Sequence, residues 1–129
     1  MKDQPVVSFD FDSTILKKEW DEEEGMDAPV GLDPIAADLI KKERKAGNKV
    51  IIVTSRREGY DNEDLFEIAK ELEIEDIHFT NGEDKVKTLL DLGVEKHYDD
   101  DSHEHKAIED KKAEIELPTM FLRENKKEP

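Results

Sequence analysis

A four-residue apolar run at residues 50–53 constrains the fold more than any other feature of this sequence. The run is Val-Ile-Ile-Val, with no polar residue inside it, and it lies between Asn48-Lys49 and Thr54-Ser55. A strand with one face in water would alternate polar and apolar residues, so a continuous run indicates a strand that is buried on both faces. Such strands occur in parallel sheets that are covered by helices on both sides.

The rest of the chain alternates between strand-like and helix-like segments. We expect further strands at about residues 5–9, 76–80, 94–98 and 114–117. We expect helices at about residues 34–45, 62–72, 83–92 and 102–112, with Asp33 and Asn62 as capping residues of the first two. The alternation predicts an α/β fold, a three-layer Rossmann-like parallel sheet with helices on both faces.

The length of the chain predicts a single domain spanning residues 1–129. Residues 16–33 are rich in turn formers and lack helical periodicity, so we expect a loop or irregular hairpin there, which would form a flap. Trp20 is interpreted as the hydrophobic anchor of this flap. Residues from about 123 to 129 are expected to form a frayed tail.

The composition restricts the partners. Asp and Glu number 35 against 20 Lys and Arg, which gives a formal net charge of −15. So acidic a surface attracts divalent cations and repels phosphate backbones and anionic membranes, which disfavours nucleic acid as a partner. The chain has no cysteine, and no apolar run approaches the roughly 18 residues of a membrane span. We therefore expect a soluble cytoplasmic protein with no membrane partner and no thiolate nucleophile.

Reactive side chains cluster where the predicted strands end. In parallel sheets the active crevice lies at the carboxyl ends of the strands, near the point where the strand order switches. The predicted strands bring four sets of residues to that edge: Asp10 and Asp12; Thr54, Ser55 and Arg56; Lys85, which opens a helix; and Asp99 and Asp100.

This mixture of side chains favours phosphate chemistry. Two carboxylates that are two residues apart on a strand, such as Asp10 and Asp12, point to the same side and repel each other unless a cation lies between them. Carboxylate oxygens suit Mg²⁺, while hydroxyl, guanidinium and ammonium groups suit an anionic substrate. One aspartate near a metal-bound phosphate can attack phosphorus, and a second can transfer protons.

The ordered set of motifs resembles that of the haloacid dehalogenase-like (HAD) superfamily of phosphohydrolases. Residues 9–14, Phe-Asp-Phe-Asp-Ser-Thr, are similar to the first motif of the family, with Ser13 where glycine is commonest. Thr54 resembles the hydroxyl of the second motif, and Ser55-Arg56 is similar to the variant in polynucleotide-phosphatase-like members.

The other two motifs are less sharply defined. Lys85 is the best match for the lysine of the third motif, with Lys87 as the alternative. Tyr98-Asp99-Asp100 resembles the fourth motif, and the following Asp101 leaves its register open by one residue.

The resemblance implies roles for these residues. Asp10 is the expected nucleophile that forms an aspartyl-phosphate, and Asp12 is the expected general acid and base. Thr54, Ser55, Arg56 and Lys85 are expected to bind phosphate. The Asp10 carboxylate and the Asp12 main-chain carbonyl are expected to bind Mg²⁺, and Asp99 and Asp100 to complete the metal site.

The implied function is a Mg²⁺-dependent phosphomonoester hydrolase that acts on a nucleotide or another small phosphomonoester. Residues 15–33 are too short for a folded cap domain, so a capless member is expected. Three alternatives stay open at this point: a phosphatase of nucleic-acid 3′ ends, a non-catalytic binding or regulatory module, and a metal-binding acidic protein that uses His97, His103 and His105.

Overall fold

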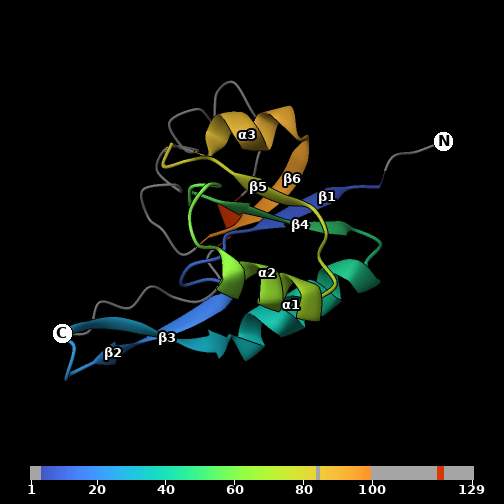
Figure 1. Ribbon diagram of the computed structural model, residues 1–129. Helices are drawn as coiled ribbons and strands as arrows, with labels where there is room; N and C mark the ends of the chain where they lie inside the picture. The colour runs from blue at the N-terminus through green and yellow to red at the C-terminus, as the bar shows by residue number, and fades with distance from the viewer. Residues whose placement is uncertain (1–3, 84, 100–118, 121–129) are drawn as a thin grey trace.

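The computed structural model describes residues 4–83, 85–99 and 119–120 (Figure 1). Its main sheet has five strands in the order β5-β4-β1-β6-β7, and every neighbouring pair is parallel. These strands are β1 (Val6–Phe9), β4 (Lys49–Thr54), β5 (Ile77–Phe79), β6 (Val94–Tyr98) and β7 (Thr119–Met120). The continuous apolar run is therefore a strand inside a parallel sheet, as predicted.

Helices cover both faces of this sheet. The helices α1 (Pro34–Lys45) and α2 (Glu63–Glu71) lie on one face, and α3 (Val86–Asp91) lies on the other (Figure 1). The predicted α/β architecture is confirmed. None of the helices in the described part of the chain is both long enough and apolar enough to cross a membrane.

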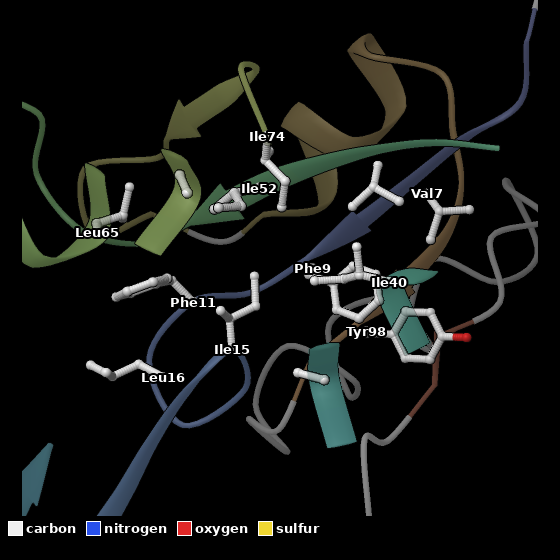
Figure 2. Packing of buried hydrophobic residues seen from close by; sticks show 13 residues of the cluster. Val7, Phe9, Phe11, Ile15, Leu16, Ile40, Ile52, Leu65, Ile74 and Tyr98 are labelled. Carbon is white, nitrogen blue, oxygen red and sulfur yellow. The ribbon is translucent and has the colours of Figure 1, made fainter. Parts of the chain in front are cut away.

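Alternate residues of β1 and β4 face opposite sides of the sheet. Each side therefore packs against its helices in a hydrophobic cluster of its own, and the two clusters hold the three layers together. On the side of α1 and α2, the ring of Phe9 stacks on that of Tyr98 with centroids 4.4 Å apart (Figure 2). On the side of α3, Ile51 and Val53 pack with Val86 and Leu89. Residues of β1 that face the α3 side, such as Ser8, therefore lie on the opposite face from Phe9.

The predicted start of α1 is confirmed, but that of α2 differs in detail. The Asp33 carboxylate accepts a hydrogen bond from the Ile35 amide at 2.8 Å, which satisfies one of the free N–H groups of the first helical turn. Asn62 precedes α2 but makes no side-chain cap. Its side-chain amide instead donates hydrogen bonds from Nδ2 to the main-chain carbonyls of Arg57 and Tyr60. Asn62 therefore fixes the loop before the helix.

Between β1 and α1 the chain forms an antiparallel hairpin of β2 (Leu16–Asp21) and β3 (Met26–Leu32), which projects from the body of the protein (Figure 1). The prediction of an irregular hairpin is confirmed. The interpretation of Trp20 as its anchor is wrong, because Trp20 pairs with Asp27 near the tip and is 63% exposed. Buried Ile15 and Leu16 hold the base of the hairpin to the core instead.

The expected helix at 102–112, the strand at 114–117 and the tail at 123–129 lie outside the described residues. The last described strand is β7, which pairs with β6 through Thr119 and Met120.

Candidate active site

The candidate site lies where the strand order switches. From β1 the chain moves through β4 to β5 on one side, then returns to β6 on the other side of β1. The carboxyl ends of β1, β4 and β6 therefore meet at the position where ligands bind in open α/β sheets. Asp10, Thr54 and Asp99 each follow or end one of these strands.

Asp10 is held from three directions. Its Oδ1 accepts a hydrogen bond from Lys85 Nζ at 2.6 Å, and its Oδ2 accepts one from Thr14 Oγ1 at 3.2 Å. Its amide donates to the carbonyl of Tyr98 at 2.9 Å, which extends the pairing of β1 with β6 beyond the strand end. The carboxylate is thus fixed just beyond the carboxyl end of β1. Asp10 is only 6% exposed there.

Lys85, and not Lys87, is the lysine of the site. The Lys85 ammonium lies 2.6 Å from an oxygen of Asp10 and 2.6 Å from an oxygen of Asp99, and the residue is 2% exposed. The Lys87 side chain is 88% exposed and pairs with Asp91 one helical turn further on. The structure therefore places the first of the two candidate lysines beside the predicted nucleophile.

One buried ammonium faces two buried carboxylates in this cluster. Burial raises the pKa of Asp10 to about 7; Lys85 opposes this rise and the charge of Asp99 adds to it. Burial also acts to raise the pKa of Asp99, but its hydrogen bond from His97 and the charge of Lys85 outweigh burial and hold the value at about 2. Lys85, Asp10 and Asp99 together carry one excess negative charge when Asp10 is ionised and His97 is neutral, which favours binding of a cation.

Asp12 lies in a separate ion pair with Arg56. Arg56 Nε donates to Asp12 Oδ2 and Arg56 Nη2 donates to Asp12 Oδ1, each at 2.8 Å. Lys18 Nζ of the hairpin lies 3.3 Å from the same carboxylate. Partial burial acts to raise the pKa of Asp12, but the Arg56 hydrogen bonds and charge outweigh it and lower the pKa.

Arg56 is also held by contacts on the side that faces away from Asp12. It donates two hydrogen bonds to Asp64 at 2.8 and 3.0 Å, and its guanidinium lies 4.9 Å from the ring centroid of Phe11. A guanidinium with two carboxylate partners and an aromatic face is rigidly placed. Arg56 therefore orients Asp12 with little freedom.

The two hydroxyl residues of the second motif occupy different environments. Thr54 is fully buried, and its Oγ1 accepts a hydrogen bond from the Arg56 amide at 3.2 Å, so it shapes the turn that leads to Arg56. Ser55 is exposed, and its carbonyl accepts from the Gly82 amide at 2.7 Å. Gly82 has a φ of +85°, a conformation that glycine adopts without strain.

The structure describes only part of the predicted metal site, which consists of Asp10, the Asp12 main-chain carbonyl, Asp99 and Asp100. Asp10 and Asp12 follow the carboxyl end of β1. Asp99 accepts hydrogen bonds from Lys85 and His97. Asp100 lies outside the described residues. Among residues 4–83 and 85–99, no group of three or more His, Asp or Glu side chains is arranged to hold a metal ion. The all-oxygen character of the strand-end residues and the excess negative charge fit Mg²⁺.

The roles of three polar residues of the site were not predicted from the sequence. Two of them had no assigned role, and the third had a different one. Thr14 and Ser8 are fully buried, and their hydroxyls meet Asp10 and His97 respectively. His97, considered above as a metal ligand, instead contacts Ser8 and Asp99, and its two suggested partners at 103 and 105 lie outside the described residues. The sequence could have indicated the roles of Ser8 and His97, because Ser8 is two residues before Asp10 and His97 is two residues before Asp99. In a strand this spacing places both members of a pair on one face.

A hollow of about 600 Å³ opens beside the site. It is lined by Ser55 and Arg56 at the end of β4 and by the loop and first turn of α2 that follow. Tyr60 on its wall is 73% exposed. The volume is in the range of small-molecule pockets, roughly 300–1,000 Å³.

Several solved structures share this fold. A 3-deoxy-D-manno-octulosonate 8-phosphate phosphatase from Moraxella catarrhalis, in complex with magnesium, phosphate and the sugar acid, is 21% identical with a TM-score of 0.50; the match covers 81% of this chain and 62% of that one. A protein from Streptomyces avermitilis described as a HAD family hydrolase is 18% identical with a TM-score of 0.54, over 90% of this chain and 66% of that one. A Pnkp1/Rnl/Hen1 complex contains a chain that is 21% identical with a TM-score of 0.59, over 92% of this chain and 46% of that one.

These likenesses define the fold. The chain has the HAD-like fold, as the four motifs predicted. It spans less than two thirds of the length of the phosphatases from Vibrio cholerae, Moraxella catarrhalis and Haemophilus influenzae that it resembles. No protein-family model matches the sequence, and no curated protein sequence matches it significantly.

Proposed function

We propose that this protein is a Mg²⁺-dependent phosphomonoester hydrolase that uses Asp10 as its nucleophile. One observation supports this function above the others: a buried Asp10 carboxylate is held by Lys85 and Thr14 next to the Asp12–Arg56 pair, at the switch point of a HAD-like sheet. A carboxylate fixed in this way needs little reorganisation before it attacks. The similar solved structures include named phosphatases, which supports the same reaction class.

In the first step, an oxygen of Asp10 forms a bond to phosphorus, and the bond from phosphorus to the ester oxygen breaks. The leaving oxygen takes a proton from Asp12. In the second step, Asp12 accepts a proton from water, and the water oxygen attacks phosphorus and releases Asp10 and inorganic phosphate. The product alcohol and phosphate account for all the atoms of the ester and of one water molecule.

The bond between Asp12 and Arg56 bears on the first step. In this arrangement Arg56 favours the ionised form of Asp12, which suits a base better than an acid. An incoming phosphate offers Arg56 another bidentate acceptor. We infer that a phosphate bound beside Arg56 shares the N–H groups of the guanidinium, which weakens their hold on Asp12 and allows Asp12 to carry the proton that the leaving oxygen needs.

Mg²⁺, when bound, neutralises charge between Asp10 and the phosphate, so that two anions can approach. The residues proposed to hold it are Asp10, the main-chain carbonyl of Asp12, and Asp100. Asp99 is assigned mainly to Lys85, because its Oδ2 already accepts hydrogen bonds from Lys85 and His97. The magnesium in the Moraxella catarrhalis structure supports the choice of ion.

The proposed substrate is a nucleotide or another small phosphomonoester whose leaving group lies in the hollow beside Arg56. Tyr60 offers a flat face for a base or sugar ring there. Asp61, Glu63 and Asp64 line the same hollow and disfavour leaving groups with further phosphates. The β2–β3 hairpin, instead of a folded cap, would then be the only cover between β1 and α1.

A nucleic-acid 3′ phosphate end is the second candidate substrate, and the net charge of −15 opposes it. A non-catalytic module and a metal-binding acidic protein are the remaining alternatives.

The test is hydrolysis of p-nitrophenyl phosphate, nucleoside monophosphates, sugar phosphates and 3′-phosphorylated oligonucleotides with Mg²⁺, by wild type and Asp10→Asn. Mg²⁺-dependent turnover of a small ester that is lost in Asp10→Asn with an unchanged circular dichroism spectrum supports the function. No turnover of any ester by the wild type would favour the non-catalytic module.

Tyr60→Ala tests the leaving-group assignment separately. This exposed change should raise KM for the preferred nucleotide and leave KM for a small ester without a ring, such as glycerol 3-phosphate, nearly unchanged. Equal KM values in the variant and the wild type for both esters would remove the hollow from the substrate site.

A further inference from the structure

Ser8 and His97 form a polar pair in the middle of the sheet. They are directly opposite each other in the pairing of β1 with β6, and both are fully buried. An apolar pair would be expected at such central positions of a parallel sheet. A buried hydroxyl and a buried imidazole cost free energy unless each is hydrogen-bonded, so this pair requires a specific partner.

The His97 ring is held at both nitrogens. Nδ1 lies 2.6 Å from Ser8 Oγ, and Nε2 lies 2.8 Å from Asp99 Oδ2. An ionised carboxylate can only accept hydrogen bonds, so Nε2 is the donor to Asp99. Ser8 fixes the opposite side of the ring and thereby fixes the direction in which Nε2 points.

Two donors converge on a single oxygen of Asp99. Asp99 Oδ2 accepts from His97 Nε2 at 2.8 Å and from Lys85 Nζ at 2.6 Å. Lys85 Nζ in turn donates to Asp10 Oδ1 at 2.6 Å. A continuous chain of hydrogen bonds therefore runs from the centre of the sheet to the proposed nucleophile.

We propose that Ser8 and His97 are positioning residues for catalysis: they set the orientation of Asp99, and through Asp99 the place of Lys85 against Asp10. This assignment rests on the proposed phosphatase function. Neither residue touches the reacting atoms. Outer partners of this kind commonly change activity or metal affinity by about 10–100-fold when they are removed.

A purely structural role is the competing explanation, because any buried polar pair affects stability. Glu43 of α1 supplies the control. Its side chain is buried on the opposite side of the sheet from His97, where its Oε2 accepts hydrogen bonds from the Tyr98 hydroxyl at 2.6 Å and from Lys96 Nζ at 2.9 Å. Glu43→Leu removes these hydrogen bonds and should lower the unfolding midpoint and leave kcat unchanged.

The experiment compares His97→Leu, His97→Gln, Ser8→Ala and Glu43→Leu in the full chain. Kinetics use p-nitrophenyl phosphate with saturating Mg²⁺, and stability is measured by urea unfolding without metal. His97→Leu should lower kcat by about 10–100-fold with KM nearly unchanged. His97→Gln keeps an N–H for Asp99 and should restore most of that loss, and Ser8→Ala should lower kcat by a few fold.

A measurement without turnover accompanies the kinetics. In urea unfolding, the effects of His97→Leu and Asp99→Asn should be clearly non-additive in the double variant, because each removes one partner of the same hydrogen bond. Additive effects would overturn the chain of contacts whether or not the protein is a phosphatase. An inactive wild type would contradict the proposed function alone, and the unfolding comparison would still decide the contact.

Two kinetic outcomes would overturn the positioning role. One is wild-type kcat in both His97→Leu and Ser8→Ala. The other is an equal loss of kcat in His97→Leu, His97→Gln and Glu43→Leu, which would reflect stability alone. If His97→Leu fails to fold, the kcat values of His97→Gln and Ser8→Ala are compared with that of Glu43→Leu at similar unfolding midpoints, and this comparison gives the same decision.

Discussion

Both carboxylate oxygens of Asp12 accept hydrogen bonds from Arg56, each at 2.8 Å, so the proposed general acid and base is clamped by the side chain that follows β4. This planar, two-point contact can form with a guanidinium but not with an ammonium.

Arg56→Lys should therefore lower kcat by about 10²-fold, within the range that general acid–base catalysis contributes. The charge is kept, but the orientation of Asp12 and the proposed bidentate contact to phosphate are lost. Steady-state kinetics with p-nitrophenyl phosphate measure the effect. Asp64→Asn, which weakens only the outer contact of Arg56, should lower kcat much less; an equal loss in the two variants would contradict the clamp.

Lys85→Met should destabilise the metal-free protein at pH 8 by about 3–5 kcal/mol, because it leaves Asp10 and Asp99 buried without their shared cation. Urea unfolding measures the free energy. Adding Asp99→Asn to this variant should recover part of the loss, since one of the two unpaired charges is then removed.

The control for this change is the neighbouring lysine. Lys87→Met alters an exposed ion pair with Asp91 and should change the free energy of unfolding by less than about 0.5 kcal/mol. A loss of similar size in Lys85→Met and Lys87→Met would show that the ammonium does not hold the carboxylates together.

The raised pKa of Asp10 predicts a pH dependence of stability. An aspartate has a pKa near 3.9 in an unfolded chain, whereas burial raises that of Asp10 to about 7 in the folded protein. The folded state therefore binds more protons at this group, and the contribution of Asp10 to the free energy of unfolding falls as pH rises from about 4 to about 7.

Urea unfolding of wild type and Asp10→Asn with a metal chelator tests this relation. The stability of Asp10→Asn relative to wild type should increase between pH 4 and pH 7, with a slope of at most about 1.4 kcal/mol per pH unit. The carboxyl groups with lowered pKa, such as Asp12, Asp64 and Asp99, are common to both proteins and contribute below that window. A relative stability that is constant with pH, or that decreases, would show that Lys85 keeps Asp10 ionised.

The sequence predicted the fold because the elements that define it are local. The run at 50–53 is typical of a doubly buried strand, and Asp33-Pro34 is typical of the start of a helix. The location of the candidate site was equally predictable. Reactive polar residues follow the predicted strands directly in the sequence, and the carboxyl ends of parallel strands meet at one edge of the sheet.

The contacts within the site were less predictable, because they depend on which strands are neighbours. Asp10 and Lys85 are 75 residues apart in sequence, and Ser8 and His97 are 89 apart. Only the placement of β1 next to β6 brings Ser8 to His97. The position of Trp20 was unpredictable for a related reason. A tryptophan anchors a hairpin only where the hairpin packs on the core, whereas Trp20 is exposed near the tip of a hairpin that projects from the core.

The most direct test of Asp10 as nucleophile is to trap the phosphorylated enzyme. Asp12→Asn should slow release of the aspartyl-phosphate, so the variant is mixed with p-nitrophenyl phosphate and Mg²⁺, quenched in acid and examined by peptide mass spectrometry. We predict one added phosphoryl group on the peptide that contains Asp10, and none in Asp10→Asn/Asp12→Asn. A phosphoryl group on another residue, or Mg²⁺-dependent turnover by Asp10→Asn at the wild-type rate, would contradict the mechanism.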